Sequence, residues 1–140
     1  IGGIWGIVFT YRKIVQENII TPADSVLPQK PVRGPRTLMV QADTVRMHTL
    51  KMTGGKTYAE MPRQIPQMDA SGKPMMDASG KPAMMENTDR DIWVTATTLT
   101  TALNVGILTY ALCAFVIVCG LMFIGGGVIL YLLSRHLNFV

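Results

Sequence analysis

A long uncharged stretch runs from Ile92 to Ser134 and reads IWVTATTLTTALNVGILTYALCAFVIVCGLMFIGGGVILYLLS. These 43 residues contain no Asp, Glu, Lys or Arg, and the whole chain is only 16% charged. Soluble domains average about 25% charged residues, and about 20 consecutive apolar residues are enough to cross a bilayer. The run therefore predicts an integral membrane protein. Because little chain remains to build a substrate pocket, we do not expect an enzyme.

The uncharged run predicts one long helix over residues 89–136, of which only a part crosses the membrane. Its beginning, Thr95–Thr101, is too rich in Thr for the lipid-facing centre of a span, so the transmembrane part is expected at about 105–133. Thr88 or Asp89 is expected to cap the N-terminus of this helix, because both side chains accept hydrogen bonds from free backbone amides.

The N-terminal segment Ile1–Tyr11 is apolar and is followed by Arg12 and Lys13. Eleven helical residues reach about 17 Å, roughly half of a hydrocarbon core of about 30 Å. Residues 1–18 are therefore predicted to hold a first transmembrane helix that is incomplete at its N-terminus, with a short interfacial anchor as the alternative. The expected fold class is an all-α membrane protein with two transmembrane helices, joined by a largely irregular extramembrane segment that contains one amphipathic helix.

The segment between these helices begins with a connector and one helix. Residues 19–36 hold four of the eight prolines, which predicts an extended connector. Residues 37–60 are predicted to form an amphipathic helix followed by a turn at Gly54 and Gly55, because glycines in this position end helices. The apolar face of this helix is suited to a partner protein, to a membrane surface or to the rest of the chain.

Residues 61–88 are expected to be an exposed loop. An eight-residue repeat lies within it, first as Met68–Met75 and then as Met76–Ala83, and both copies contain Asp-Ala-Ser-Gly-Lys-Pro. This composition is typical of turns, and a period of eight matches neither a helix nor a strand. The repeat is therefore interpreted as a duplication in a loop.

Methionine is the chemically notable excess, since six of the ten methionines fall between residues 61 and 85. Thioether sulfurs are soft ligands that select Cu(I), so the loop is a candidate copper site. Methionine serves adaptable packing against a partner equally well, and this alternative stays open. The candidate metal ligands are Met61, Met68, Met75, Met76, Met84 and Met85.

Small residues recur every seven positions along the uncharged run. The five members of this stripe are Gly106, Cys113, Gly120, Gly127 and Ser134. Small residues allow helices to approach closely in membranes, and a seven-residue step predicts a left-handed crossing. The stripe is therefore a candidate helix-packing surface for the first helix or for another subunit. The alternative is the general richness of membrane helices in small residues. Gly125–Gly127 would also suit contact with a lipid or a pigment ring.

The sequence contains little that indicates nucleotide binding, catalysis or nucleic-acid binding. Gly55-Lys56-Thr57 resembles the end of a phosphate-binding loop, but the first glycine of that pattern would fall at Leu50. His48 and His136 are isolated from each other and from any cysteine, and no catalytic set or resident cofactor is expected. The net charge of +4 is spread along the chain, so nucleic-acid binding is not expected either.

Several short stretches resemble a family of small uncharacterised bacterial membrane proteins that is common in actinobacteria. The matching stretches are Lys30–Pro35, Gln41–Asp43, His48–Leu50 and Thr53–Glu60. The resemblance implies a two-span architecture with a polar middle segment, and it implies no activity and no catalytic residue. The methionine-rich repeat of residues 68–83 lies outside the pattern.

These observations together predict a non-catalytic accessory subunit of a larger membrane complex, of the energy-converting or monooxygenase type. Its expected partners are other membrane subunits and the lipid bilayer. The alternative function is that of a Cu(I)-binding membrane protein that uses the methionine-rich loop. The expected location is the bacterial inner membrane, with the middle segment on the non-cytoplasmic side.

Overall fold

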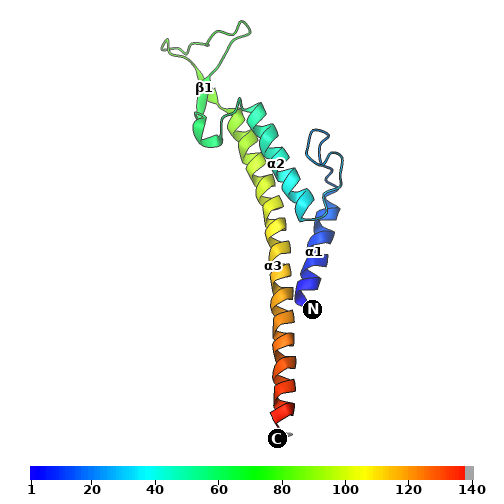
Figure 1. The fold of residues 1–140 in the computed structure, drawn as a ribbon. Helices are drawn as coiled ribbons and strands as arrows, with labels where there is room; N and C mark the ends of the chain where they lie inside the picture. Colours follow the sequence, from blue (N-terminus) through cyan, green and yellow to red (C-terminus); the bar gives the residue numbers. More distant parts are fainter. Residues whose placement is uncertain (138–140) are drawn as a thin grey trace. The chain divides into compact units, whose positions relative to one another are not determined.

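A computed structural model describes residues 1–137 (Figure 1). Three α-helices, one short 3-10 helix and two short strands follow one another along this part of the chain. Their bounds are α1 Gly2–Gln16, α2 Pro35–Met52, η1 Tyr58–Glu60, β1 Gln64–Pro66, β2 Met84–Glu86 and α3 Thr88–Leu137. The chain divides into two compact units. The first combines Ile1–Gln41 with the chain from Leu103 onward, and the second is Ala42–Ala102.

The prediction of an all-α fold with two transmembrane helices is wrong. Within residues 1–137, α3 is the one helix that is long and apolar enough to cross a membrane. Helix α1 has 15 residues, which gives a length of about 22 Å against a hydrocarbon core of about 30 Å. It ends before Asn18, whose φ of 50° places it in the left-handed region that stops a helix. Strands β1 and β2 also form a small antiparallel sheet.

In the first unit, α1 packs against α3 through two glycines. A Cβ atom on Gly3 would lie 2.6 Å from Cγ1 of Ile117 and 2.7 Å from the carbonyl oxygen of Cys113. A Cβ atom on Gly6 would lie 2.5 Å from Sγ of Cys113. The helices approach closely because neither position carries a side chain, and Cys113 is consequently buried.

The proline-rich connector is ordered by its own hydrogen bonds. The buried Thr21 accepts a hydrogen bond on its hydroxyl oxygen from the Lys30 amide (2.9 Å), and its hydroxyl donates to the Leu27 carbonyl. After this turn, Leu38 in α2 is buried and lies against Gly106 of α3. The connector thus packs locally instead of being extended throughout.

The second unit is held by Trp93 of α3. Its indole N–H donates to Oγ1 of Thr53 (3.2 Å) and to the Lys56 carbonyl (2.8 Å), just after the end of α2. The chain turns there through Gly54 and Gly55, with φ of 60° and 79°, so the predicted glycine stop is confirmed. A buried tryptophan requires a partner for its N–H, and this turn supplies two.

The predicted cap of α3 is wrong by one residue. Asn87 precedes the helix, and its side-chain oxygen accepts a hydrogen bond from the Asp89 amide (3.1 Å). The same side chain donates through Nδ2 to the Pro62 carbonyl (3.0 Å). Asn87 was not distinguished from Thr88 and Asp89 because all three residue types accept such bonds, and the contact with Pro62 is a tertiary one.

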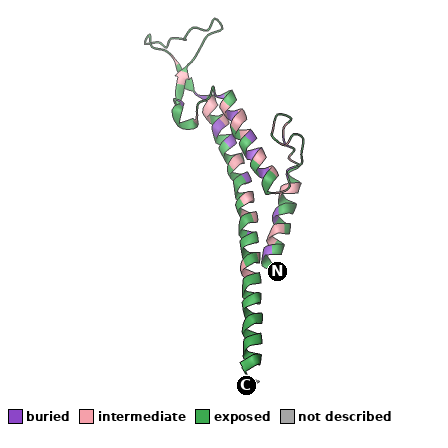
Figure 2. Cartoon of the chain, viewed as in Figure 1, coloured by how far each residue is buried: buried purple, intermediate pink, exposed green. Residues whose placement is uncertain are grey.

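Burial is concentrated in a few side chains of each unit (Figure 2). The buried apolar residues are Val32, Leu38, Leu103 and Cys113 in the first unit, and Ala42, Met61, Trp93 and Ala96 in the second. Figure 2 shows that the C-terminal part of α3 is exposed around its whole circumference. An apolar helix with no protein cover requires another apolar environment.

Candidate functional site

Two members of the seven-residue stripe on α3 contact other parts of the first unit. A Cβ atom on Gly106 would lie 3.2 Å from Cδ1 of Leu38 and 3.7 Å from Cδ1 of Ile14. Cys113 faces the close approach of α1 described above. These two positions therefore act as helix-packing positions inside the chain.

The other three members of the stripe are Gly120, Gly127 and Ser134. Within residues 1–137, no atom outside the local helix lies within 4 Å of a Cβ built on Gly120 or Gly127. Gly120 is half-buried beside an apolar groove of about 160 Å³, and Gly127 and Ser134 are exposed. Gly125 and Gly126 also have open space around them. Gly127 and Ser134 therefore lie open within the described chain, and contact with lipid or pigment at Gly125–Gly127 stays a prediction.

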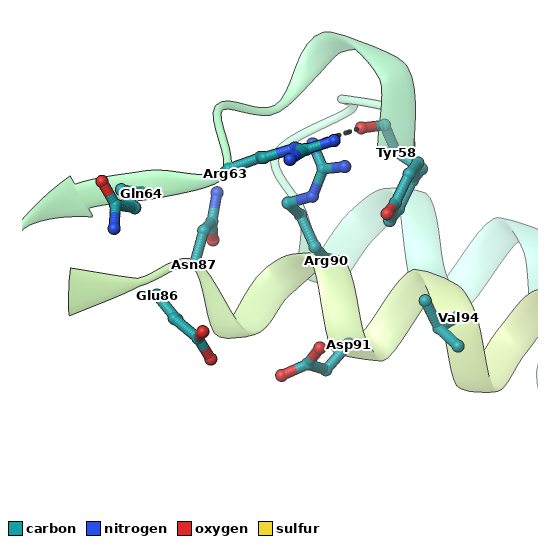
Figure 3. A pocket seen from close by; sticks show the side chains of 8 residues that line it. All are labelled: Tyr58, Arg63, Gln64, Glu86, Asn87, Arg90, Asp91 and Val94. Carbon is teal, nitrogen blue, oxygen red and sulfur yellow. Dashed lines mark hydrogen bonds between the residues drawn. The ribbon is translucent and has the colours of Figure 1, made fainter.

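A polar cavity of about 540 Å³ lies in the second unit, where β1 and β2 meet the start of α3 (Figure 3). Its lining residues are Tyr58, Arg63, Gln64, Glu86, Asn87, Arg90, Asp91 and Val94. The guanidinium of Arg90 lies 3.8 Å from the centre of the Tyr58 ring and donates to the carbonyls of Met61 (2.6 Å) and Tyr58 (3.3 Å). No local sequence pattern indicates this cavity, because its residues come from four separate segments.

The residues of this cavity hold the backbone together more than they offer reactive groups. Arg90 and Asn87 both bind carbonyl groups of the segment between η1 and β1. Nearby, Oε2 of Glu60 accepts hydrogen bonds from the amide (2.7 Å) and hydroxyl (2.8 Å) of Thr57, and these bonds lower the pKa of Glu60. Such hydrogen bonding favours an ordinary ionised carboxylate, not a general acid or base.

The structure separates the six candidate methionine ligands into two groups. Met61 is buried, with 4% of its surface exposed, and lies before β1 in the contact with Arg90. The other five are exposed and belong to the repeat loop or to β2; they are Met68, Met75, Met76, Met84 and Met85. Met61 is therefore unavailable to a ligand that binds the loop.

The first copy of the repeat folds around the carboxylate of Asp69. Its Oδ1 accepts hydrogen bonds from the Lys73 amide (2.9 Å), the Ser71 amide (2.8 Å) and the Ser71 hydroxyl (2.7 Å). Gly72 takes a φ of 77° that a side chain would disfavour. The bonds from Lys73 and Ser71 lower the pKa of Asp69, so the turn is built on the ionised carboxylate.

The second copy repeats the same turn around Asp77. Its Oδ1 accepts from the Ser79 hydroxyl (2.6 Å), the Ser79 amide (2.8 Å) and the Lys81 amide (3.0 Å), and Gly80 has a φ of 75°. These bonds, led by the one from the Ser79 side chain, lower the pKa of Asp77. The predictions of two turns of one type and of an exposed loop are confirmed, and the loop is ordered by its own hydrogen bonds.

Three copies of a shorter pattern, Pro-X-Met, join these turns to the sheet at a spacing of eight residues. We call the three segments the Pro-X-Met ring; they are Pro66–Met68, Pro74–Met76 and Pro82–Met84. Their middle residues exchange backbone hydrogen bonds cyclically. Met75 N–H donates to the Gln67 carbonyl (2.8 Å), Ala83 N–H to the Met75 carbonyl (2.7 Å), and Gln67 N–H to the Ala83 carbonyl (2.8 Å). Figure 1 shows the result as a triangular loop above β1.

The outer residues of the ring pair in the same cyclic order. Each methionine stands opposite the proline of another segment in antiparallel register, as Met68 with Pro74, Met76 with Pro82, and Met84 with Pro66. Proline fits here because its position needs no backbone donor. The ring is thus a three-fold arrangement in which two arms are the repeat turns and the third is the sheet of β1 and β2.

Neither a known relative nor a conventional metal cluster accompanies these features. Comparisons with protein families, with curated proteins and with solved structures found no match to this chain. Within residues 1–137, His, Cys, Asp and Glu form no group of three that could hold a metal ion.

Proposed function

We propose that this chain is a non-catalytic accessory subunit of a larger membrane complex, anchored through one span of α3. The observation that carries the proposal is that none of the most apolar 18-residue window of α3 is buried within the described chain. A single helix satisfies its backbone hydrogen bonds internally and can cross a bilayer. An apolar surface of this extent is unfavourable in water and is stable in contact with lipid or with other apolar helices.

The position of the free small residues supports a protein partner in addition to lipid. Gly106 and Cys113 already have neighbours in the first unit, and Gly120 lines a groove with Ile4 of α1. Gly127 and Ser134 continue the same stripe as exposed residues. Helix association in a membrane relies on close packing at small residues, because lipid tails are as apolar as leucine. We therefore propose that the C-terminal part of the stripe packs against a helix of another membrane subunit. The complex would be of the energy-converting or monooxygenase type.

The test compares two glycines that differ only in the face of α3 on which they lie. Gly127 belongs to the stripe, and Gly126 lies about 100° away around the helix. Leucine favours the helix over glycine by roughly 0.8–1 kcal/mol, so neither Gly127→Leu nor Gly126→Leu should unfold α3. The protein is extracted from native membranes in mild detergent and sized on a native gel.

The proposal expects wild type and Gly126→Leu to migrate with partner subunits, and Gly127→Leu to migrate mainly as the free chain. Recovery of the wild-type chain as a lone monomer would contradict it. Equal behaviour of the two variants would contradict the role of the stripe.

For location, we propose the bacterial cytoplasmic membrane with the repeat loop on its non-cytoplasmic side. The basis is the Arg135 side chain in the last turn of α3, since Lys and Arg next to a span favour the cytoplasmic side and place the other end of α3 outside. Ser71→Cys places a thiol on an exposed turn, whereas the native Cys113 is buried and Cys119 is half-buried in the apolar run. Labelling of Ser71→Cys in intact cells by a membrane-impermeant maleimide is expected, and labelling only after lysis would reverse the orientation.

A further inference from the structure

We propose that the Pro-X-Met ring is a Cu(I) site in which Met68, Met76 and Met84 supply three thioether ligands. This inference does not depend on the accessory-subunit proposal, because it concerns only the second unit and can be measured on the isolated chain. The observation behind it is the cyclic register of the ring, which gives these three methionines equivalent positions.

The register places the three methionines on one face of the ring. Residues that stand directly opposite each other in an antiparallel pair share a face, and so do residues two apart on one strand. Met68 stands opposite Pro74, and Pro74 is two residues before Met76. Met76 stands opposite Pro82, which is two residues before Met84. Met84 stands opposite Pro66, which is two residues before Met68, so all three methionines share a single face.

The spacing within the ring suits a shared ligand. Each pair of methionines is related as diagonal neighbours, which lie about 7–8 Å apart between Cα atoms in antiparallel pairs. The centre of such a triangle lies about 4–5 Å from each corner. A methionine side chain has three rotatable bonds and reaches this far with its sulfur. All three side chains are exposed, with exposed fractions of 55% for Met68, 63% for Met76 and 50% for Met84.

The remaining methionines of the region do not share the face of the three proposed ligands. Met75 is a middle residue of the ring, so the alternation of side chains places it on the opposite face. Met85 pairs with Ile65 in the sheet and lies one position out of phase with Met84. Met61 is buried away from the loop. The structure therefore reduces the six candidate ligands to three.

The chemistry of three thioethers selects the ion. Neutral sulfur ligands are soft and favour Cu(I), whereas Zn²⁺, Ca²⁺ and Mg²⁺ prefer imidazole, thiolate or oxygen ligands. Oδ1 of Asp69 and Oδ1 of Asp77 each accept hydrogen bonds within the turns. The scaffold is held by the ring bonds and by these turns, which fixes the ligand positions in advance.

The experiment measures Cu(I) affinity of the full chain in detergent micelles, under anaerobic conditions, by competition with a chromophoric Cu(I) chelator. One Cu(I) per chain is expected. Leucine resembles methionine in volume, so Met→Leu variants should keep the fold, which circular dichroism will check. Met68→Leu, Met76→Leu and Met84→Leu are each expected to weaken binding by about tenfold or more, since even the loss of a residue that only supports a ligand costs 10–100-fold. Met75→Leu and Met85→Leu should stay within about twofold of wild type.

The results that would overturn the proposal are equally specific. These are no measurable Cu(I) binding, unchanged affinity in the triple leucine variant, or equal losses in Met75→Leu and Met76→Leu. The last result would indicate methionines that bind as an unordered set. A second readout follows the methyl resonances of methionine on addition of Cu(I), with shifts expected for residues 68, 76 and 84. Shifts confined to residues 75 and 85 would contradict the assignment.

Discussion

The repeat loop and the C-terminal part of α3 are both built on a short period, and the two periods lead to opposite outcomes. In the loop, a step of eight residues brings Gln67, Met75 and Ala83 into a closed cycle of backbone hydrogen bonds. In α3, a step of seven residues leaves Gly127 and Ser134 exposed within residues 1–137. A repeat that closes on itself completes its structure within the chain. A repeat along a straight helix leaves a surface that only another molecule can cover.

Removal of one arm of the ring tests whether Cu(I) binding depends on the closed cycle. Deletion of residues 76–83 leaves two Pro-X-Met segments, which can form only an extended hairpin. We expect Cu(I) affinity to fall by at least tenfold, because one of three ligands is lost, while helix content by circular dichroism stays unchanged. Ala78→Gly keeps all three segments and serves as the control. An unchanged affinity after the deletion would show that the closed ring is not needed.

A second prediction tests whether the glycines of α1 are needed to keep Cys113, a member of the stripe, buried. Gly3→Ala places a Cβ atom 2.6 Å from Cγ1 of Ile117 and 2.7 Å from a backbone oxygen, and overpacking of this kind costs about 1–3 kcal/mol. Gly2→Ala meets open space within the described residues and is the matched control. Faster alkylation of the buried Cys113 in Gly3→Ala than in Gly2→Ala is expected in the same detergent. Equal alkylation rates would mean that α1 does not protect this position.

The smallest expected effect concerns pH. Hydrogen bonds lower the pKa of Asp69 and Asp77 below the usual 3.8, so the folded turns favour the ionised carboxylates. Their contribution is fully present above 3.8 and is lost as the pH falls through the lower pKa of the folded turns. The amide resonances of Gly72 and Gly80 should therefore stay constant from pH 7 to 5, and so should Cu(I) affinity, because thioethers carry no proton in this range. A decline in affinity centred near pH 6.5 would indicate a histidine ligand instead.

The features that could be read from the sequence are those set by local chemistry. An uncharged run determines α3, paired glycines end α2, and Asp-Ser-Gly spacing sets both turns, since each of these involves neighbouring residues. The first helix was assigned to the membrane as an incomplete span because its composition is apolar, whereas α3 is the one helix of residues 1–137 that is long and apolar enough to cross. Composition alone does not show that an apolar segment has a helix of the same chain to pack against.

The features that were missed depend on residues far apart in the chain. The third ring segment, Pro66–Met68, shares only proline and methionine with the two repeat copies, so it was not counted with them. Its role appears only through the pairing of Pro66 with Met84 in the sheet. The polar cavity around Arg90 likewise needs the contact with Tyr58, 32 residues away along the chain. Such contacts leave no local pattern to detect.

The closed cycle of the ring has a consequence for how this loop can evolve. Each eight-residue unit enters and leaves at the ring, so an in-frame duplication or loss changes the number of arms and leaves the β1–β2 pairing in place. Every added unit brings one proline, one Asp-based turn and one methionine at the third position of a Pro-X-Met segment. Replication slippage can thus change the number of arms, and with it the number of ring methionines, one unit at a time while α2 and α3 keep their sequence.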